Sequence, residues 1–122
     1  MSKSALSDKS LAFAGRVVRM ARYLRDEKKE HTISSQVLRS GTSIGANIAE
    51  ARSAISKKEF LSKIFISLKE CRETSYWLKL LYETGYLTDA QFQSMHADCS
   101  ELYRILSATA KTTSTNLQKP DK

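Results

Sequence analysis

Glu50, Glu70, Glu73 and the two histidines are the side chains of this 122-residue sequence that invite a test for metal chemistry. Di-iron sites in helical bundles use glutamates together with Glu-x-x-His motifs on facing helices. The residues three positions before His31 and His96 are lysine and glutamine, so neither histidine completes that motif. We therefore expect the glutamates to pair with arginine or to hydrogen-bond at a helix interface, without a metal or cofactor. A metal–carboxylate enzyme is kept as the third hypothesis.

Gly41 and Gly45 raise the question of a phosphate-binding loop. They lie in RSGTSIGANIAEARSA, residues 39–54, and give only G-x-x-x-G. Such a loop needs a following lysine, or a G-x-G-x-x-G pattern after a strand, and neither is present. The stretch has helical periodicity instead, and the two glycines continue with Ala49 and Ser53 as a ridge of small residues. Each interior glycine costs a helix about 1 kcal/mol relative to alanine, so we expect another backbone to approach closely along this ridge.

The arginines near the N-terminus are the best-placed side chains for binding. The net charge is +7, which favours an acidic partner, nucleic acid first and an anionic membrane surface second. Arg16 and Arg19 have no acidic residue three or four positions away, whereas Arg22 can pair with Asp26. Arg16, Arg19 and Arg22 predict a stripe for phosphates, with Tyr23 beside it as a stacking surface. A solvated charged face without a ligand is the open alternative.

The candidates for nucleophilic catalysis are weak. Cys71 and Cys99 are not in a C-x-x-C motif, and neither has a base nearby in the sequence. We interpret them as buried thiols of a reducing compartment rather than as a disulfide or redox pair. The serines are scattered over polar faces. The sequence therefore predicts a protein that is not an enzyme.

The elements that position these residues are helices, since the chain has four glycines and one proline, which lies near its end. Apolar residues recur with helical spacing over residues 8–30, 34–54, 57–83 and 89–113. Ser56 with Glu59, and Thr88 with Gln91, give capping-box patterns at two helix starts, and Gly85 marks a helix end. Short connections predict an all-α, antiparallel up-down-up-down four-helix bundle over residues 1–113. Residues 114–122 are polar, and we expect a disordered tail.

The third predicted helix has more apolar surface than one bundle face needs. One stripe faces the bundle interior, and a second set of side chains lies well round the helix from it. A helix with two apolar faces needs two partners, and we expect the second to be another subunit. A wide core with a partly exposed tryptophan is the alternative. The residues predicted for this subunit interface are Ile66, Glu70, Glu73, Trp77 and Leu81.

Three motifs carry a resemblance to a known family. They are RSGTSIGANIAEA at residues 39–51, SKKEF at residues 56–60 and LKECRETSYWLKLL at residues 68–81. In this order they resemble the bacterial four-helix-bundle family named after proteins encoded in 23S ribosomal RNA intervening sequences. That family is similar to the accessory proteins of diversity-generating retroelements, which form basic pentameric barrels and engage nucleic acid and a reverse transcriptase.

The resemblance implies a homo-oligomeric ring, commonly a pentamer, and brings no catalytic residue with it. For most members of the family the function is unknown. The residues that fit the family pattern are expected to serve packing and inter-helix polar contacts rather than chemistry. Besides Gly41 and Gly45 on the ridge, they are Asn47, Glu50, Glu70, Glu73 and Trp77.

The cellular location and the function are predicted from the length of the uncharged stretches, the character of the N-terminus and the basic charge. The longest stretch without a charged residue, residues 40–49, is far shorter than the roughly 20 apolar residues that a membrane span needs, and the N-terminus lacks a signal-peptide core. The sequence thus predicts a cytoplasmic protein without a membrane partner. We expect a non-enzymatic oligomer that binds RNA or DNA through phosphate contacts. The alternative is a protein–protein adaptor with an unidentified acidic partner.

Overall fold

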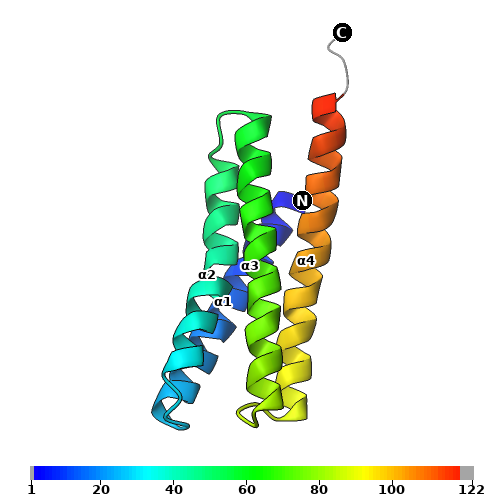
Figure 1. Cartoon of the computed structure of the whole chain (residues 1–122). Helices are drawn as coiled ribbons and strands as arrows, with labels where there is room; N and C mark the ends of the chain where they lie inside the picture. Colours follow the sequence, from blue (N-terminus) through cyan, green and yellow to red (C-terminus); the bar gives the residue numbers. More distant parts are fainter. Residues whose placement is uncertain (1, 119–122) are drawn as a thin grey trace.

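The computed structural model describes residues 2–118, with the side chains of residues 5–117. Over these residues the chain forms four helices and no strand, which confirms the all-α prediction. The helices are α1 (Ser2–Asp26), α2 (Thr32–Arg52), α3 (Lys57–Glu83) and α4 (Asp89–Gln118). Figure 1 shows the chain turning back at each connection, so that α2 and α3 lie side by side and α4 lies along α3. None of these helices combines the length and the apolar character that crossing a membrane requires.

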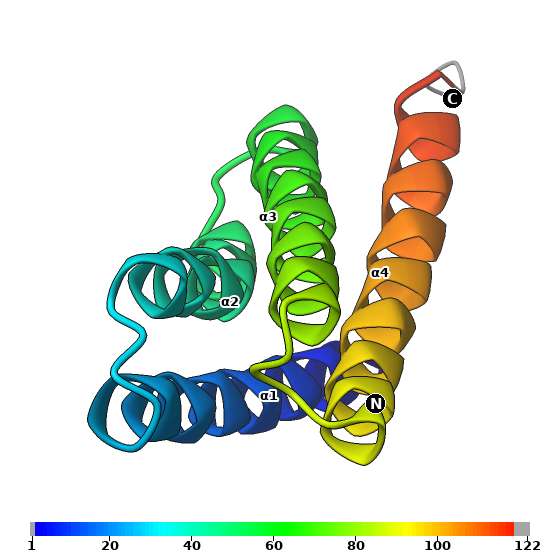
Figure 2. The same cartoon turned by 60° about the horizontal axis from the view of Figure 1, so that its bottom comes forward.

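One hydrophobic core joins the four helices. Figure 2 shows α1 and α3 on opposite sides of this core, with α2 and α4 between them. α3 packs on both α2 and α4, whereas α1 packs mainly on α2 and only briefly on α4. Apolar side chains at helical spacing fill the interior, and each helix supplies part of it. The largest fully buried side chains include Phe13, Leu24, Ile44, Ile64, Leu78, Leu81, Leu102 and Leu106.

The contact between α1 and α2 depends on small residues. A Cβ atom on Gly41 would lie 2.8 Å from each of the two methyl carbons of Val17. A Cβ atom on Gly45 would lie 3.4 Å from the Ser10 hydroxyl oxygen. The ridge predicted from the sequence therefore faces α1 at Gly41 and Gly45, and the approach is closest at Gly41. The rest of the predicted ridge does not pack closely, because Ala49 is exposed and Ser53 lies beyond the end of α2.

The bounds of α3 agree with the capping signals. The Ser56 hydroxyl accepts a hydrogen bond from the Glu59 backbone N–H at 3.1 Å, which satisfies a donor of the first turn. The Glu59 carboxylate accepts from the Ile55 N–H at 3.0 Å. At the other end, Gly85 has φ +86°, a left-handed conformation that glycine adopts without a Cβ penalty. The helix predicted over residues 57–83 is confirmed at both ends.

The connection between α1 and α2 differs from the prediction. α1 ends at Asp26 rather than at residue 30, and Lys29 has φ +57°. The Glu30 carboxylate then accepts hydrogen bonds from the backbone N–H groups of Ile33 (3.1 Å) and Ser34 (2.7 Å). This carboxylate satisfies donors of the first turn of α2, and so the helix begins at Thr32, two residues earlier than predicted, and ends at Arg52.

The outer ends of α1 and α4 also extend beyond the predicted bounds. α1 begins at Ser2 rather than at residue 8, and Leu6 in the added turns is buried. α4 continues to Gln118, because no glycine or proline interrupts residues 89–119. The prediction of a disordered tail is therefore wrong for residues 114–118, and residues 119–122 lie outside the described part of the chain.

The last turns of α4 extend past the N-terminus of α1 (Figure 1). A hollow of about 720 Å³ lies at this end of the core, between apolar side chains of all four helices. Its lining includes Leu6 of α1, Ile48 of α2, Phe60 of α3 and Ile105 of α4. The last turns of α4 therefore leave an open space beside the first turns of α1 and α3.

Candidate nucleic-acid interface

Arg16 of α1 is held by α4. Its Nη1 atom lies 2.6 Å from Oδ2 of Asp98, and its Nη2 donates a hydrogen bond to the Ser94 hydroxyl at 2.8 Å. This pair could not be predicted from the sequence, because 82 residues separate the two partners along the chain. Arg16 is therefore paired with a carboxylate within the protein, whereas the sequence placed no acidic residue near it.

Arg19 and Arg22 remain open to a ligand. Both are exposed, and in the part of the chain that the structure describes neither lies within 4.0 Å of a carboxylate. The expected pair of Arg22 with Asp26 is replaced by an ion pair between Arg25 and Asp26 at 2.9 Å. The hydrogen bond from Arg25 lowers the pKa of the Asp26 carboxyl, and the charge of Arg22 adds to this effect.

Tyr23 is also accessible, with 38% of its surface exposed. Together with Arg16 and Arg19 it lines a hollow of about 290 Å³ between α1 and the start of α4. The Lys28 ammonium lies 5.9 Å from the centre of the Tyr23 ring, a weak cation–π distance for an exposed pair. The hollow offers one charged guanidinium free of a carboxylate and one aromatic ring to a phosphate-bearing ligand.

The carboxylates predicted for a subunit interface are paired within the chain. Arg39 of α2 bridges Glu70, at 3.4 Å, and Glu73 of α3. The Trp77 indole N–H donates to the Glu73 carboxylate at 3.0 Å. For Glu70 and Glu73 this agrees with the expectation that the glutamates pair with arginine. Among the described residues, no group of three or more His, Cys, Asp or Glu side chains is placed to hold a metal ion.

The remaining residues of the predicted interface have different surroundings. Leu81 is fully buried in the core, so its assignment to a subunit interface is wrong. Trp77 is partly buried against the same core, and Ile66 is half-buried. The physical reason is the central place of α3, whose two apolar faces pack on α2 and α4 of the same chain. Leu81 and Trp77 on the second face therefore have packing partners within the chain itself.

Two further residues that were predicted to serve helix packing, Asn47 and Glu50, each make one polar contact. The Asn47 side-chain amide donates to the Ser43 backbone oxygen at 2.9 Å, which is a contact within α2 rather than between helices. Glu50 forms an ion pair with Lys63 of α3 at 2.7 Å, and this pair raises the pKa of the Lys63 ammonium. Glu50 thus links α2 to α3 on the protein surface.

The two cysteines are buried free thiols, as the sequence predicted. The Cys99 thiol donates to the Cys71 backbone oxygen at 3.4 Å, across the contact between α3 and α4. The hydrogen bond between the two thiols and their burial raise the pKa of Cys71. A protonated, buried thiol is a poor nucleophile, which fits a structural role for this residue.

The fold and the distribution of charge define a small all-α protein with four helices and a surplus of exposed basic side chains. The model of the 23S rRNA-intervening sequence protein family matches residues 2–108, and the chain belongs to this family. The match extends well beyond the three motifs quoted above, into the first and last helices.

One solved structure is closely similar to the whole protein. It is a crystal structure of a protein of unknown function from the S23 ribosomal protein family, from Bacteroides thetaiotaomicron VPI-5482. The two sequences are 47% identical over 91% of this chain and 99% of the other, and the TM-score is 0.90. No match was found among curated proteins.

Proposed function

We propose that the protein binds RNA or DNA through phosphate contacts and that this role is not enzymatic. The observation that carries the proposal is the contrast among the arginines of α1. Arg16 and Arg25 are paired with carboxylates at 2.6 Å and 2.9 Å, whereas Arg19 and Arg22 are exposed and have no such partner among the described residues. The second pair can therefore meet phosphates without first breaking an ion pair.

The energetics favour a backbone contact over base recognition at this surface. Each phosphate neutralised by a lysine or arginine releases condensed counterions, which gives affinity that does not depend on sequence. The net charge of +7 adds a long-range attraction for polyanions. α1 presents no row of amide side chains of the kind that reads base edges, so we expect low sequence specificity.

We infer that the antiparallel, up-down-up-down bundle is one subunit of a ring, in line with the family resemblance. Large apolar side chains outside the core support self-association, since Leu11 is 74% exposed and Ile55 is 94% exposed. A ring would repeat Arg19 and Arg22 in every subunit and so strengthen the field that attracts a polyanion. Multi-angle light scattering at several concentrations tests this inference, and a monomer throughout would contradict it.

Binding to labelled RNA and DNA at increasing salt tests the main proposal. Replacing Arg19→Gln and Arg22→Gln should reduce the slope of log affinity against log salt by about 1.4–1.8, at about 0.7–0.9 for each lost phosphate contact. The matched control, Arg16→Gln with Arg25→Gln, removes the same charge from the same helix but should change the slope much less. Both double variants should keep parental helicity.

Failure of the proposal has a clear signature. If the parent protein retains neither RNA nor DNA at low salt, nucleic-acid binding is excluded, and an adaptor with an acidic protein partner becomes the better hypothesis. If the control variant loses as much affinity as the Arg19 and Arg22 variant, the effect is one of net charge. The assignment to this face of α1 would then be wrong.

A further inference from the structure

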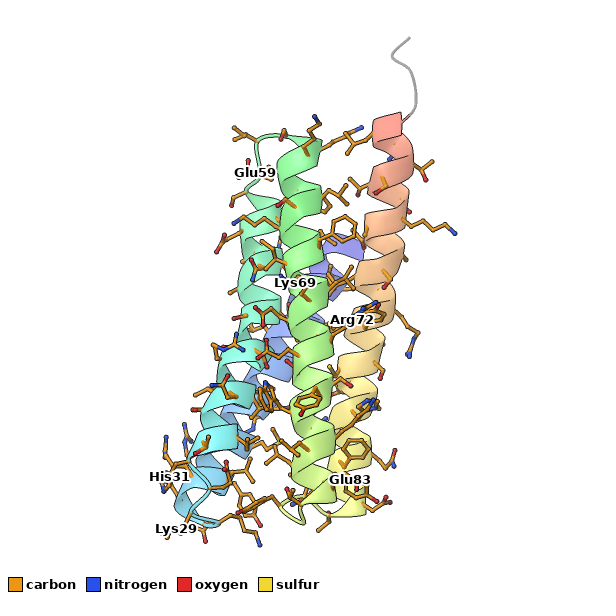
Figure 3. All side chains as sticks on the ribbon, in the orientation of Figure 1. Lys29, His31, Glu59, Lys69, Arg72 and Glu83 are labelled. Carbon is orange, nitrogen blue, oxygen red and sulfur yellow. The ribbon has the colours of Figure 1, made fainter. Side chains whose placement is uncertain are left out.

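A second basic surface lies between α3 and α4. Two hollows of about 440 Å³ and 490 Å³ meet there, and both are lined by Arg72 of α3 and Tyr103 of α4. Figure 3 shows Lys69 and Arg72 on neighbouring turns of α3, with Arg72 on the side towards α4. We name this surface the outer groove. Five exposed basic side chains line it: Lys69, Arg72, Lys79, Arg104 and Lys111.

The outer groove has no acidic residue in its lining. The carboxylates in the middle of both helices are held on other faces. On α3, Glu70 and Glu73 pair with Arg39 of α2. On α4, Asp98 and Glu101 pair with side chains of α1, at 2.6 Å and 3.3 Å. The same ion pairs that fix the helices against one another therefore leave the groove with uncompensated positive charge.

Aromatic rings accompany the charges along the groove. Phe65 and Tyr76 of α3 are 49% and 58% exposed, an unusual exposure for rings of this size. Tyr103 of α4 accepts hydrogen bonds from Arg72 at 2.7 Å and 3.2 Å, and the guanidinium carbon lies 5.5 Å from the centre of its ring. The Arg72 guanidinium and the aromatic rings thus offer flat surfaces for stacking beside the basic side chains of the groove.

The floor between these side chains is made of small residues. Ser75, Cys71, Cys99 and Ser100 line the first hollow, so nothing bulky fills the space between the rings. His96 also lies there, with Nε2 at 3.0 Å from the Ser75 hydroxyl oxygen. Burial lowers the pKa of His96, and the charge of Lys79 lowers it further, so this ring is neutral at neutral pH and adds no charge.

The groove is long enough for several nucleotides. From Phe65 to Lys79 along α3 it spans about 21 Å, at 1.5 Å of helix rise per residue. Along this length, positions 65, 69, 72, 76 and 79 lie on one helix face and read Phe, Lys, Arg, Tyr, Lys, so each aromatic ring has a basic side chain next to it. Proteins that bind single strands combine such a positive track with rings on which unpaired bases stack.

We propose that the outer groove binds a single-stranded segment of RNA or DNA, with phosphates on its basic side chains and bases against its rings. This inference rests on the proposed nucleic-acid function and adds the class of strand and a site on α3 and α4. In a duplex the bases are stacked on one another, so their faces are closed to Tyr76 and Phe65. The groove therefore favours single strands over duplexes.

Fluorescence anisotropy with labelled probes tests the inference on the intact protein. The probes are an oligothymidine and an oligouridine of about ten nucleotides, the oligothymidine annealed to oligoadenine, and an abasic strand of equal length. Tyr76→Ala should weaken binding of the two single strands roughly 5- to 150-fold, the effect expected for loss of one stacked base. Binding of the duplex and the abasic strand should not change, and Tyr76→Phe should bind like the parent because it keeps the ring.

The charge on the groove is tested separately. Arg72→Gln with Arg104→Gln should reduce the salt slope for single strands by about 1.4. The control Lys57→Gln with Lys58→Gln removes the same charge from exposed positions at the start of α3 and should have a smaller effect. Circular dichroism confirms that each variant is folded; Tyr76 is exposed enough that its loss should leave the core intact.

Each other outcome counts against one part of the proposal. If the parent binds nucleic acid but the groove variants bind as the parent does, the outer groove is not the site and the proposed function stands. If Tyr76→Ala weakens duplex, abasic and single strands equally, base stacking is excluded. If the parent binds none of the probes at low salt, both the groove and the proposed function are excluded.

Discussion

Gly41→Ala is the substitution for which the structure gives the sharpest prediction of stability. In an ordinary helix interior, replacing glycine by alanine stabilises the helix by about 1 kcal/mol. At position 41 the added carbon would lie 2.8 Å from both methyl carbons of Val17, which is fully buried. Real Cβ atoms do not approach carbon this closely, so either Val17 or the whole of α1 must shift.

The magnitude follows from the balance of these two effects. Overpacking a well-packed core costs about 1–3 kcal/mol. Val17 is β-branched and stiff about its first side-chain torsion, and both of its branches meet the added carbon, so we take the upper half of that range. After subtracting the gain in helix propensity, we expect Gly41→Ala to lower the free energy of unfolding by about 1–2 kcal/mol. This corresponds to a fall in Tm of about 4–8 °C for a protein of this size.

Urea denaturation followed by far-ultraviolet circular dichroism measures this change at a fixed protein concentration. Gly45→Ala is the matched control, because its added carbon meets the Ser10 hydroxyl at an ordinary 3.4 Å. The control should therefore be as stable as the parent or gain up to about 1 kcal/mol. Adding Val17→Ala to Gly41→Ala should recover part of the loss. A Gly41→Ala protein at least as stable as the parent would refute close packing of α1 on α2.

Three further predictions concern other contacts. Asp98→Asn should free Arg16 and steepen the salt dependence of RNA binding. The control Glu27→Gln changes the net charge by the same amount without freeing an arginine, so it should steepen the salt dependence less. Equal effects of the two variants would show that net charge alone determines the salt dependence. Thr74→Val removes the buried 2.8 Å hydrogen bond between Thr74 and the Ser40 hydroxyl of α2. This should lower the free energy of unfolding, measured by urea denaturation, by about 1–3 kcal/mol. An unchanged free energy of unfolding would show that this bond contributes nothing. Because its pKa is lowered in the fold, His96 favours the folded state above its ordinary pKa of about 6.5, and this stability is lost as the pH falls below that value. Thermal unfolding between pH 7.5 and about 5.5 should therefore show a smaller loss for His96→Gln than for the parent; parallel pH profiles would contradict this assignment.

The sequence predicted the helices best where a local signal marks their ends. Both ends of α3 could be predicted to the exact residue, because Ser56 caps the first turn and Gly85 takes the left-handed conformation that ends the helix. The end of α1 could not be predicted as well. Lys29 adopts a left-handed conformation, and the Glu30 carboxylate caps α2 from a position that precedes the helix. Neither feature has a common sequence pattern. The end of α4 was predicted from polar composition alone. Composition is a poor guide here, because polar residues continue a helix where no glycine or proline interrupts it.

The candidate site was harder to predict than the fold because it depends on contacts between distant residues. Arg16 looked free in the sequence, and only the packing of α4 on α1 brings Asp98 to it. Leu81 has the spacing of a second apolar face in the sequence, but α3 lies between two helices of its own chain and this residue is buried there. The spacing of Lys69, Arg72 and Tyr76 was visible in the sequence. That no acidic side chain lines the two hollows with them follows only from the fold.

The unequal lengths of the helices give the protein two levels of local stability. Backbone amides in the middle of α3 should open only when the whole core unfolds, because α2 and α4 pack on both sides of this helix. The last turns of α4 have no facing turn of α1, and Leu117 is 38% exposed. Their hydrogen bonds can open without disturbing the rest of the molecule. In native-state hydrogen exchange, the amides of residues 111–118 should therefore exchange by local fraying, at rates nearly independent of low denaturant concentrations. The amides around Leu78 should instead report global unfolding.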